Sequence, residues 1–317
     1  MSELMVQNTH TEVGTPKTAL DYISESKSTN TRLAYHKDWM SFITYCQQHN
    51  LTSLPATPQT IGEYIADLAN NGRKISTIKR HIASISQAHQ TAGLETPTRT
   101  AYVRDLIKGI ANTNGSASHS KKAAVINDIR LMVDTLDDRL IGIRDRALLL
   151  IGFAGAFRRS ELVALNVEDI EITRDGLAIT IRRSKTDQEG QGRKVGIPYG
   201  SHTETCPVRA YVAWLSGSGI VEGAVFRSID RHGNMKDRMS DKAVAIVVKR
   251  AAESAELDAT QYAGHSLRSG FATTAAENDV SERAIMRQTG HKSVQMVRRY
   301  IQEGELFKHN AAAEIGL

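Results

Sequence analysis

The first third of the chain repeats its apolar positions at the spacing of amphipathic helices. One predicted helix face carries side chains at i, i+4, i+7 and i+11, namely Tyr35, Trp39, Phe42 and Cys46. Further helices, bounded by proline, asparagine and glycine signals, are expected at 58–71, 75–93 and 98–112. The pattern predicts a small all-helical domain at 16–112, preceded by a disordered N-terminus at 1–15.

A polar stretch interrupts this periodicity. Residues 112–122 read NTNGSASHSKK, and they are small, polar and without an apolar repeat. Such a composition is typical of a flexible linker, which we place at 113–122. A flexible linker between two basic domains would allow them to close around a rod-shaped ligand.

The second domain, expected at 123–301, mixes helical and strand patterns. Its first helices are expected at 127–137, 140–155 and 159–165. Three alternating stretches then predict a small antiparallel sheet, at 169–173, 177–181 and 193–197. Helices are expected again at 206–217, 240–256, 265–277, 281–289 and 293–301. The predicted fold class is mainly α: a two-domain clamp, with an N-terminal helical bundle and a C-terminal mixed α/β domain that carries the sheet.

Composition narrows the class of protein only moderately. The chain has 40 Lys and Arg against 35 Asp and Glu, a net charge of +5, which permits a polyanionic partner without requiring one. Cys46 and Cys206 lie far apart, so we expect neither a disulfide framework nor a CxxC metal site. No signal peptide is expected, and the longest apolar run, 147–157, falls short of the about 20 residues that span a bilayer. These features indicate a cytoplasmic protein without a membrane segment.

Arg158 and Glu161 follow this apolar run directly and share one helix face at i, i+3. For an isolated RxxE motif, a surface salt bridge is the plainer interpretation. The apolar run favours another, because a buried helix would hold Arg158 at a fixed position. Glu161 could then orient one edge of the guanidinium while a phosphate occupies the other edge.

Lys185 lies just beyond the second expected strand, in the basic sequence RRSKT at 182–186. Basic residues concentrated at a hairpin usually mark a solvated sheet edge. The alternative is a lysine that a mobile loop carries into a groove. Arg182 and Arg183 are weaker candidates for that position.

Two more motifs stand at predicted helix ends. His265 and Arg268 form an HxxR motif at the start of a helix, whose free N–H groups favour an anion. Gly290-His291 ends another helix, and Gly290 suits the left-handed position after its last turn. Each motif is a weak signal when it is taken alone.

Tyr300 lies late in the following helix. One interpretation is an amphipathic core residue whose hydroxyl reaches solvent. Another is that 281–301 forms a helix-turn-helix, with Arg298 and Arg299 available for nucleic acid.

The order of these motifs resembles that of the tyrosine recombinases, the phage-type integrase family, from about Ser26 to Tyr300. The resemblance implies a catalytic set of Arg158, Glu161, Lys185, His265, Arg268, His291 and Tyr300. In that set Tyr300 is the nucleophile, His265 is its candidate base, and Lys185 protonates the leaving 5′-oxygen. The two arginines and His291 hold the phosphate. The family pattern selects Arg158 over its neighbour Arg159, which is expected to face solvent or the DNA backbone.

The resemblance also implies an activity: site-specific recombination that cleaves and rejoins DNA through a 3′-phosphotyrosyl intermediate. No metal, ATP or other cofactor is expected, and the chain lacks Walker A, GxGxxG and HExxH motifs. The expected partner is double-stranded DNA with inverted-repeat half-sites, on which four protomers exchange strands through a Holliday junction. A type IB topoisomerase and a non-catalytic helix-turn-helix regulator are the alternatives.

Residues 302–317 are expected to form a docking segment. Gly304 can act as a hinge, and an apolar stripe at i, i+4 and i+8 follows it: Phe307, Ala311 and Ile315. A helix this short needs a groove to be stable in water. The resemblance favours a groove on a neighbouring protomer, which would close a cyclic tetramer. A groove on the segment's own domain is the alternative.

Overall fold

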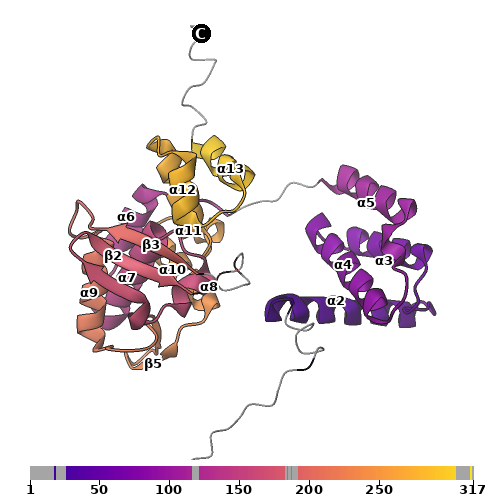
Figure 1. Ribbon diagram of the computed structural model, residues 1–317, viewed down its shortest axis with the longest axis horizontal. Helices are drawn as coiled ribbons and strands as arrows, with labels where there is room; N and C mark the ends of the chain where they lie inside the picture. Colours follow the sequence, from indigo (N-terminus) through magenta and orange to yellow (C-terminus); the bar gives the residue numbers. More distant parts are fainter. Residues whose placement is uncertain are drawn as a thin grey trace, which may run out of the picture. The chain divides into compact units, whose positions relative to one another are not determined.

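The residues that the computed structural model describes are Thr18, 26–115, 121–182, Ser184, Asp187, 192–304 and Ile315. Residue contacts divide the chain into two compact units, Met1–His119 and Ser120–Leu317, each of which is described by itself. Helices make up most of the described residues, and small antiparallel sheets occur in the second unit (Figure 1). This composition confirms the predicted mainly α class. Residues 1–15 lie outside the described residues.

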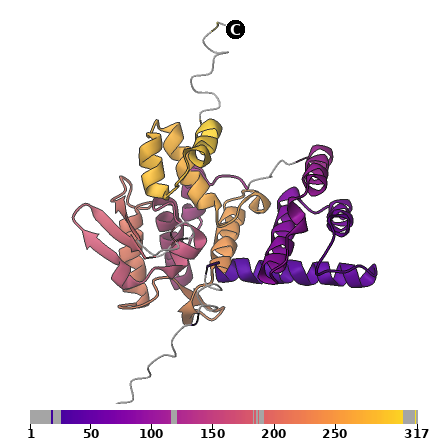
Figure 2. The same ribbon diagram turned by 45° about the vertical axis from the view of Figure 1, so that its right-hand side comes forward.

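The first unit is a helical bundle, as its apolar spacing predicts (Figure 2). Its helices are α2 (Thr29–Gln48), α3 (Pro58–Asn70), α4 (Ile75–Thr91) and α5 (Ala101–Asn114), with the 3₁₀ helix η1 (Pro97–Arg99) before α5. Phe42 and Cys46, two residues of the predicted helix face, are buried in its core, and Trp39 packs against that core. The Thr57 hydroxyl caps α3 by accepting from the Thr60 N–H at 3.1 Å.

A buried polar network lies inside this bundle, and the apolar pattern does not predict it. The Asp38 carboxylate accepts from Arg80 at 2.7 and 3.0 Å and lies 3.2 Å from His81. The Tyr64 hydroxyl lies 2.8 Å from Nδ1 of the same histidine. Burial lowers the pKa of His81 and raises the pKa of Tyr64 to about 12. The network gives these polar groups partners inside an otherwise apolar core.

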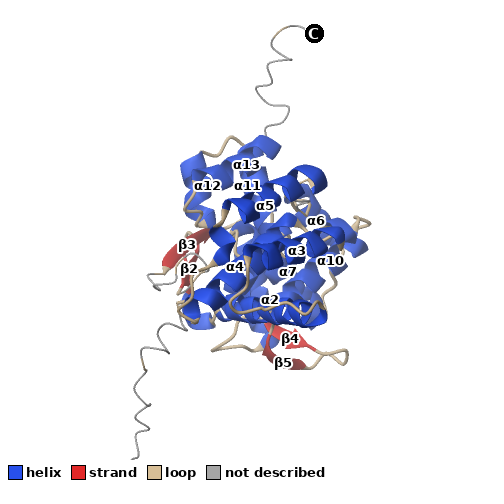
Figure 3. Cartoon of the chain, turned by 90° about the vertical axis from the view of Figure 1, so that its right-hand side faces the viewer, coloured by secondary structure: helices blue, strands red, loops and turns tan. Residues whose placement is uncertain are grey.

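The helices of the second unit are α6 (Ile126–Asp134), α7 (Leu140–Ala154), α8 (Arg159–Ala164), α9 (Pro207–Ser218), α10 (Asp241–Ser254), α11 (Ser266–Glu277), α12 (Glu282–Thr289) and α13 (Val294–Gly304). An antiparallel sheet with the order β1-β2-β3 is formed by β1 (Ile170–Thr173), β2 (Gly176–Ile181) and β3 (Arg193–Pro198). A separate antiparallel pair is formed by β4 (Arg227–Ile229) and β5 (Met235–Arg238) (Figure 3). The three-stranded sheet confirms the alternating pattern of the sequence.

α7 is the central helix of the second unit. All its residues from Ala147 to Phe153 are buried, and it packs against α9 and α11. A helix that is apolar on every side belongs in a core. α11 in turn passes so close to Ala124 that a Cβ at Gly270 would lie 1.8 Å from the Ala124 carbonyl oxygen. These contacts fix the helices that carry the motifs.

The structure corrects several expected boundaries. α5 continues through Asn114, and the N–H of Lys122 donates to the Gln261 carbonyl at 2.8 Å, so both ends of the expected linker at 113–122 carry defined structure. α13 runs on to Gly304, three residues beyond its expected end at 301, so this glycine closes a helix.

The expected docking stripe is described only at Ile315, whose side chain is exposed. Phe307 and Ala311 lie outside the described residues. The β4–β5 pair is missed by the sequence pattern, because the segments RSI and MKDR are too short and too polar to show alternation.

Candidate active site

Arg158 is held at the junction of two helices. Beyond α7, Ala156 has a left-handed backbone with φ of 49°, Phe157 is buried, and Arg158 is the N-cap residue of α8. A positive φ is uncommon for alanine. In this conformation the Ala156 carbonyl accepts a hydrogen bond from Nη1 of Arg268 at 2.8 Å. The junction therefore positions one arginine and supplies an acceptor for the other.

Glu161 is the buried anion of the site, with 1% of its side chain exposed. Its Oε1 accepts from Nη1 of Arg158 at 2.6 Å, and its Oε2 accepts from the Arg158 backbone N–H at 3.0 Å. Nη2 of Arg193, at the start of β3, donates to Oε2 at 3.4 Å. The RxxE pair is thus a buried pair that orients two guanidinium groups.

Arg268 is a buried cation with unused donors. The residue is 1% exposed, and its Nε and Nη2 have no hydrogen-bond partner among the described residues. Burial, followed by the nearby charge of Arg158, lowers the pKa of Arg268 to about 10, so the guanidinium stays charged at neutral pH. A buried charge with free donors is costly until an anion pairs with it.

His265 and Tyr300 meet beside this cation. The Tyr300 hydroxyl lies 3.4 Å from Nε2 of His265, the N-cap residue of α11. The half-buried Tyr300 ring packs on the apolar cluster of α11, α12 and α13, and it stacks on His291 with ring centroids 6.0 Å apart. Loss of solvation, followed by the charges of Arg268 and Arg158, lowers the pKa of His265. A neutral imidazole at this position can accept a proton.

His291 follows the end of α12. Gly290 has φ of 66°, which confirms the left-handed position that the motif predicts. His291 is buried, and its Nδ1 lies 2.8 Å from the hydroxyl oxygen of Thr289. Loss of solvation, followed by the charges of Arg268 and Arg158, lowers the pKa of His291 to about 4. The ring is therefore neutral in the DNA-free protein.

Arg158, His265 and His291 open onto a pocket of about 520 Å³. Its lining consists of Arg158, Arg159, Ser160, Asp241, His265, His291, Lys292, Ser293 and Met296. Arg159, which is expected to face solvent or DNA, is half-exposed at this pocket, with its Nη2 3.7 Å from Asp241. The pocket combines positive charge, donors and imidazole rings, a suitable environment for a phosphate.

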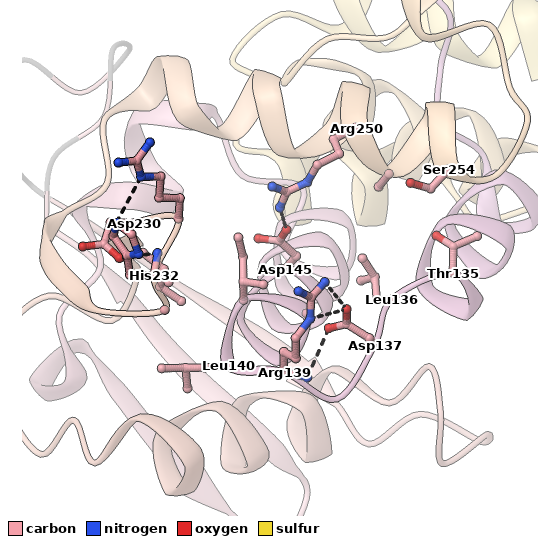
Figure 4. Close-up of a pocket in the computed structure, with 16 residues that line it drawn as sticks. Thr135, Leu136, Asp137, Arg139, Leu140, Asp145, Asp230, His232, Arg250 and Ser254 are labelled. Atoms are coloured by element: carbon pink, nitrogen blue, oxygen red, sulfur yellow. Dashed lines mark hydrogen bonds and ion pairs between the residues drawn. The ribbon is translucent and has the colours of Figure 1, made fainter.

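A second pocket, of about 510 Å³, lies between α6, α7, α10 and the β4–β5 loop (Figure 4). Two of its three arginines have anionic partners: Arg250 pairs with Asp145, and Arg139 pairs with Asp137. Nε of the third, Arg231, donates to Nε2 of His232 at 3.0 Å. Three carboxylates and three arginines line this pocket, whereas the lining of the first has three cations and one carboxylate, so the excess of positive charge belongs to the first pocket.

All predicted site residues except Lys185 lie within the described residues. Arg158, His265 and His291 line the pocket; Glu161 bonds to Arg158, Tyr300 lies beside His265, and the charge of buried Arg268 acts on both histidines. Lys185 and Arg183 lie outside the described residues. Arg182, the other candidate at this hairpin, pairs with Asp169 at 2.6 Å.

Sequence analysis missed Arg193. Its Nη1 donates to the Gln288 carbonyl at 3.0 Å, and its Nη2 reaches Glu161, so it joins β3 to α12 and to the site. The signal in the sequence is only an arginine at a predicted strand start, followed by Lys194.

The described part of the chain shows neither a cluster of metal ligands nor a membrane-spanning helix. There, no group of three or more His, Cys, Asp or Glu side chains is placed to hold a metal ion. No helix in the same part is long and apolar enough to cross a membrane.

The chain resembles known proteins over most of its length. It matches the phage integrase family over residues 126–305 and the phage integrase N-terminal SAM-like domain over residues 20–96. It is 43% identical over 294 residues to the integrase/recombinase xerD homolog of Selenomonas ruminantium, with 91% of this chain and 86% of the relative covered. It is 26% identical over 282 residues to the recombinase cre of Escherichia phage P1, with 82% and 80% covered.

Solved structures share the fold. The Tn1549 transposon integrase in complex with transposon right end DNA superposes with a TM-score of 0.63 at 14% identity, covering 93% of this chain and 95% of that chain. The XerH recombinase bound to a palindromic difH substrate gives 0.61 at 17% identity, covering 81% and 72%. At these identities the likeness shows the fold alone. The sequence matches show more: the chain belongs to the phage integrase family, and it is a tyrosine recombinase that catalyses site-specific exchange of DNA strands.

Proposed function

We propose that this recombinase cleaves DNA with Tyr300 as the nucleophile. The tyrosine oxygen forms a bond to phosphorus, the bond from phosphorus to the 5′-oxygen breaks, and a 3′-phosphotyrosyl link and a free 5′-hydroxyl result. The observation that carries the proposal is the buried Arg268, whose Nε and Nη2 have no partner among the described residues. Its neighbours include Arg158 and Tyr300, so a phosphate held there lies beside a phenol.

Two proton transfers accompany this step. The Tyr300 proton passes to Nε2 of His265, the acceptor nearest its hydroxyl. The 5′-oxygen takes a proton from Lys185, an assignment that rests on sequence position in the β2–β3 connection. Arg158 and Arg268 stabilise the charge of the pentacoordinate transition state, and His291 adds a hydrogen bond to the phosphate.

The reaction is proposed to need neither metal nor ATP. Two guanidinium groups supply the positive charge that Mg²⁺ supplies in many phosphoryl transfers. The phosphotyrosyl link keeps the energy of the broken phosphodiester, so the free 5′-hydroxyl of a second duplex can reverse the reaction and join a new strand.

The proposed substrate is double-stranded DNA with inverted-repeat half-sites, around which the two units close as a clamp. Four protomers act on two sites and exchange strands through a Holliday junction. Membership of the phage integrase family supports this assembly, and the net charge of +5 is compatible with a DNA partner. Residues 302–317 are proposed to dock on a neighbouring protomer.

A nicked suicide substrate tests the chemistry. The wild-type protein should form a denaturation-resistant adduct with DNA, and Tyr300→Phe should form none, because it lacks the hydroxyl. Tyr199→Phe is the matched control, since Tyr199 is exposed and lies outside the pocket. An undiminished adduct in Tyr300→Phe would refute the assignment. Recombination should require two sites on a plasmid, whereas a topoisomerase would relax a supercoiled plasmid that carries one.

Deletion of 307–317 tests the assembly. The shortened protein should fold and bind a single half-site normally, but it should lose cooperative binding to a full site and most of its recombination. Normal assembly would show that the segment is not an assembly element. Loss of folding would show that it packs on its own domain.

A further inference from the structure

Thr289, the last residue of α12, is fully buried, and its hydroxyl oxygen lies near two carbonyl oxygens, a longer contact of 3.4 Å to Met286 and a shorter one to Ile285, as well as near His291. Its Oγ1 lies 2.7 Å from the Ile285 carbonyl oxygen and 2.8 Å from Nδ1 of His291. A hydroxyl carries one proton, and a carbonyl oxygen can only accept. Two oxygens separated by 2.7 Å require that proton between them. The hydroxyl therefore donates to Ile285, and Nδ1 of His291 must donate to the hydroxyl.

We propose that Thr289 is a positioning residue that fixes His291 in its Nδ1–H tautomer, so that Nε2 meets the DNA phosphate as a donor only when the ring is protonated. In the neutral ring Nε2 carries a lone pair, and a phosphate oxygen is also an acceptor. Among the described residues no hydrogen-bond partner occupies Nε2, and His291 lines the pocket. The inference rests on the proposed function, because it assigns the phosphate to this pocket.

The charges that act on the ring are those of Arg158 at the start of α8, Arg193 of β3, His265 at the N-cap of α11 and Arg268 of α11, and Tyr300 of α13 stacks on it. Asp187 and Lys292 line pockets beside it. With no anion present, burial and the arginine charges keep the imidazole neutral. A bound phosphate adds negative charge to the same pocket and raises the pKa of the ring. His291 then takes one proton from solvent and donates from Nε2 to a phosphate oxygen. DNA binding and protonation of His291 are therefore coupled.

Nitrogen-15 NMR of histidine-labelled protein tests the tautomer directly, with the His291 signals assigned by comparison with His291→Gln. In the DNA-free wild type, Nδ1 should carry the proton and Nε2 should not. Thr289→Ser keeps the hydroxyl and should keep this tautomer. Thr289→Val keeps the shape but not the hydroxyl, so the Nε2–H form should rise. With a bound half-site the wild type should show protons on both nitrogens.

An Nε2–H signal in the DNA-free wild type would overturn the proposal, and this result needs neither catalysis nor a variant. So would a tautomer that stays the same in Thr289→Val. If the predicted tautomers are found while Tyr300→Phe still forms a covalent adduct, the nucleophile assignment fails and the tautomer assignment stands.

The pH dependence of single-turnover cleavage gives a functional readout. Since DNA raises the pKa of His291, the donor form is present below that bound-state pKa and is lost as pH rises through it. Cleavage by the wild type and Thr289→Ser should therefore fall about tenfold per pH unit on this alkaline limb. In Thr289→Val the cleavage rate should not fall in this alkaline range, because the neutral His291 ring can then carry a proton on Nε2. A uniform drop at every pH in Thr289→Val would assign Thr289 to packing alone and overturn the proposal.

Discussion

Glu161→Gln replaces the buried carboxylate between Arg158 and Arg193 with a neutral amide of the same size. The amide oxygen can still accept from the Arg158 backbone N–H. The amide nitrogen, however, turns donors toward a guanidinium group that can only donate. The change leaves two arginine charges without their counter-ion, close to the buried charge of Arg268.

The structure sets the size of the effect. A charge-assisted hydrogen bond contributes about 1.5–3 kcal/mol, and removing one partner of a buried ion pair costs about 3–5 kcal/mol. The 2.6 Å bond to Arg158 is lost, the 3.4 Å contact to Arg193 is weaker, and the backbone bond survives. We expect the free energy of unfolding of the DNA-free protein to fall by about 3 kcal/mol, which lowers Tm by roughly 6–12 °C.

Thermal unfolding followed by circular dichroism measures this change, with Glu282→Gln as the control. Glu282 pairs with Arg298 at 3.0 Å on the surface, so its loss should cost less than about 1 kcal/mol. Half-site DNA supplies a phosphate where the carboxylate charge was lost, so the difference in Tm should shrink in the complex. Folding and DNA binding form one thermodynamic cycle, so a variant that is destabilised less in the complex than in the free protein binds DNA at least as tightly. The half-site affinity of Glu161→Gln should therefore be unchanged or tighter. Cleavage should still fall roughly tenfold to hundredfold, because Arg158 is no longer held in place.

Two results would exclude this role of Glu161. If Glu161→Gln unfolds and cleaves like Glu282→Gln, the carboxylate does not orient Arg158. If binding and cleavage weaken in parallel, Glu161 supports DNA binding as a whole rather than the transition state.

Arg268→Lys keeps the charge but loses the planar guanidinium that donates two hydrogen bonds at once, so cleavage should fall by about 10²–10³ while the half-site Kd changes little. Equal losses of binding and cleavage would make Arg268 a contact to the DNA backbone. Lys185→Ala should be rescued by a substrate with a 5′-bridging sulfur, since a thiol with a pKa of about 8.5 leaves without a proton. Equal slowing on both substrates would remove Lys185 as the acid and direct attention to Arg183. Excess EDTA should leave cleavage of short linear duplexes unchanged, and chelator-sensitive cleavage would contradict a mechanism based on two arginines.

Local patterns predicted the elements that carry the site. The apolar run 147–157 predicted a buried helix, and the structure ends that helix at Ala154, four residues before Arg158. Gly290 predicted a left-handed helix end, which the structure confirms. The buried helix and the left-handed helix end are each determined by residues a few positions apart, so they can be predicted from one sequence.

Local patterns did not predict the contacts between segments that lie far apart in the sequence. Arg193 reaches Gln288, which lies 95 positions away, and strand alternation carries no sign of that contact. The bond between Thr289 and His291 spans two positions, yet its meaning depends on burial and on the arginines around the ring. Likewise, nothing in the helical spacing shows that Asp38 and His81 meet inside the first bundle.

The proposed role of Tyr300 is to form the covalent bond to DNA. Its most direct test is to trap the wild-type protein on a nicked half-site, digest the adduct with protease and nuclease, and sequence the modified peptide by mass spectrometry. We expect the nucleotide to be attached to Tyr300, in the peptide that follows Arg299, as the proposed role of this residue requires. Attachment to any other residue, or a cleaved substrate without a covalent peptide, would contradict it.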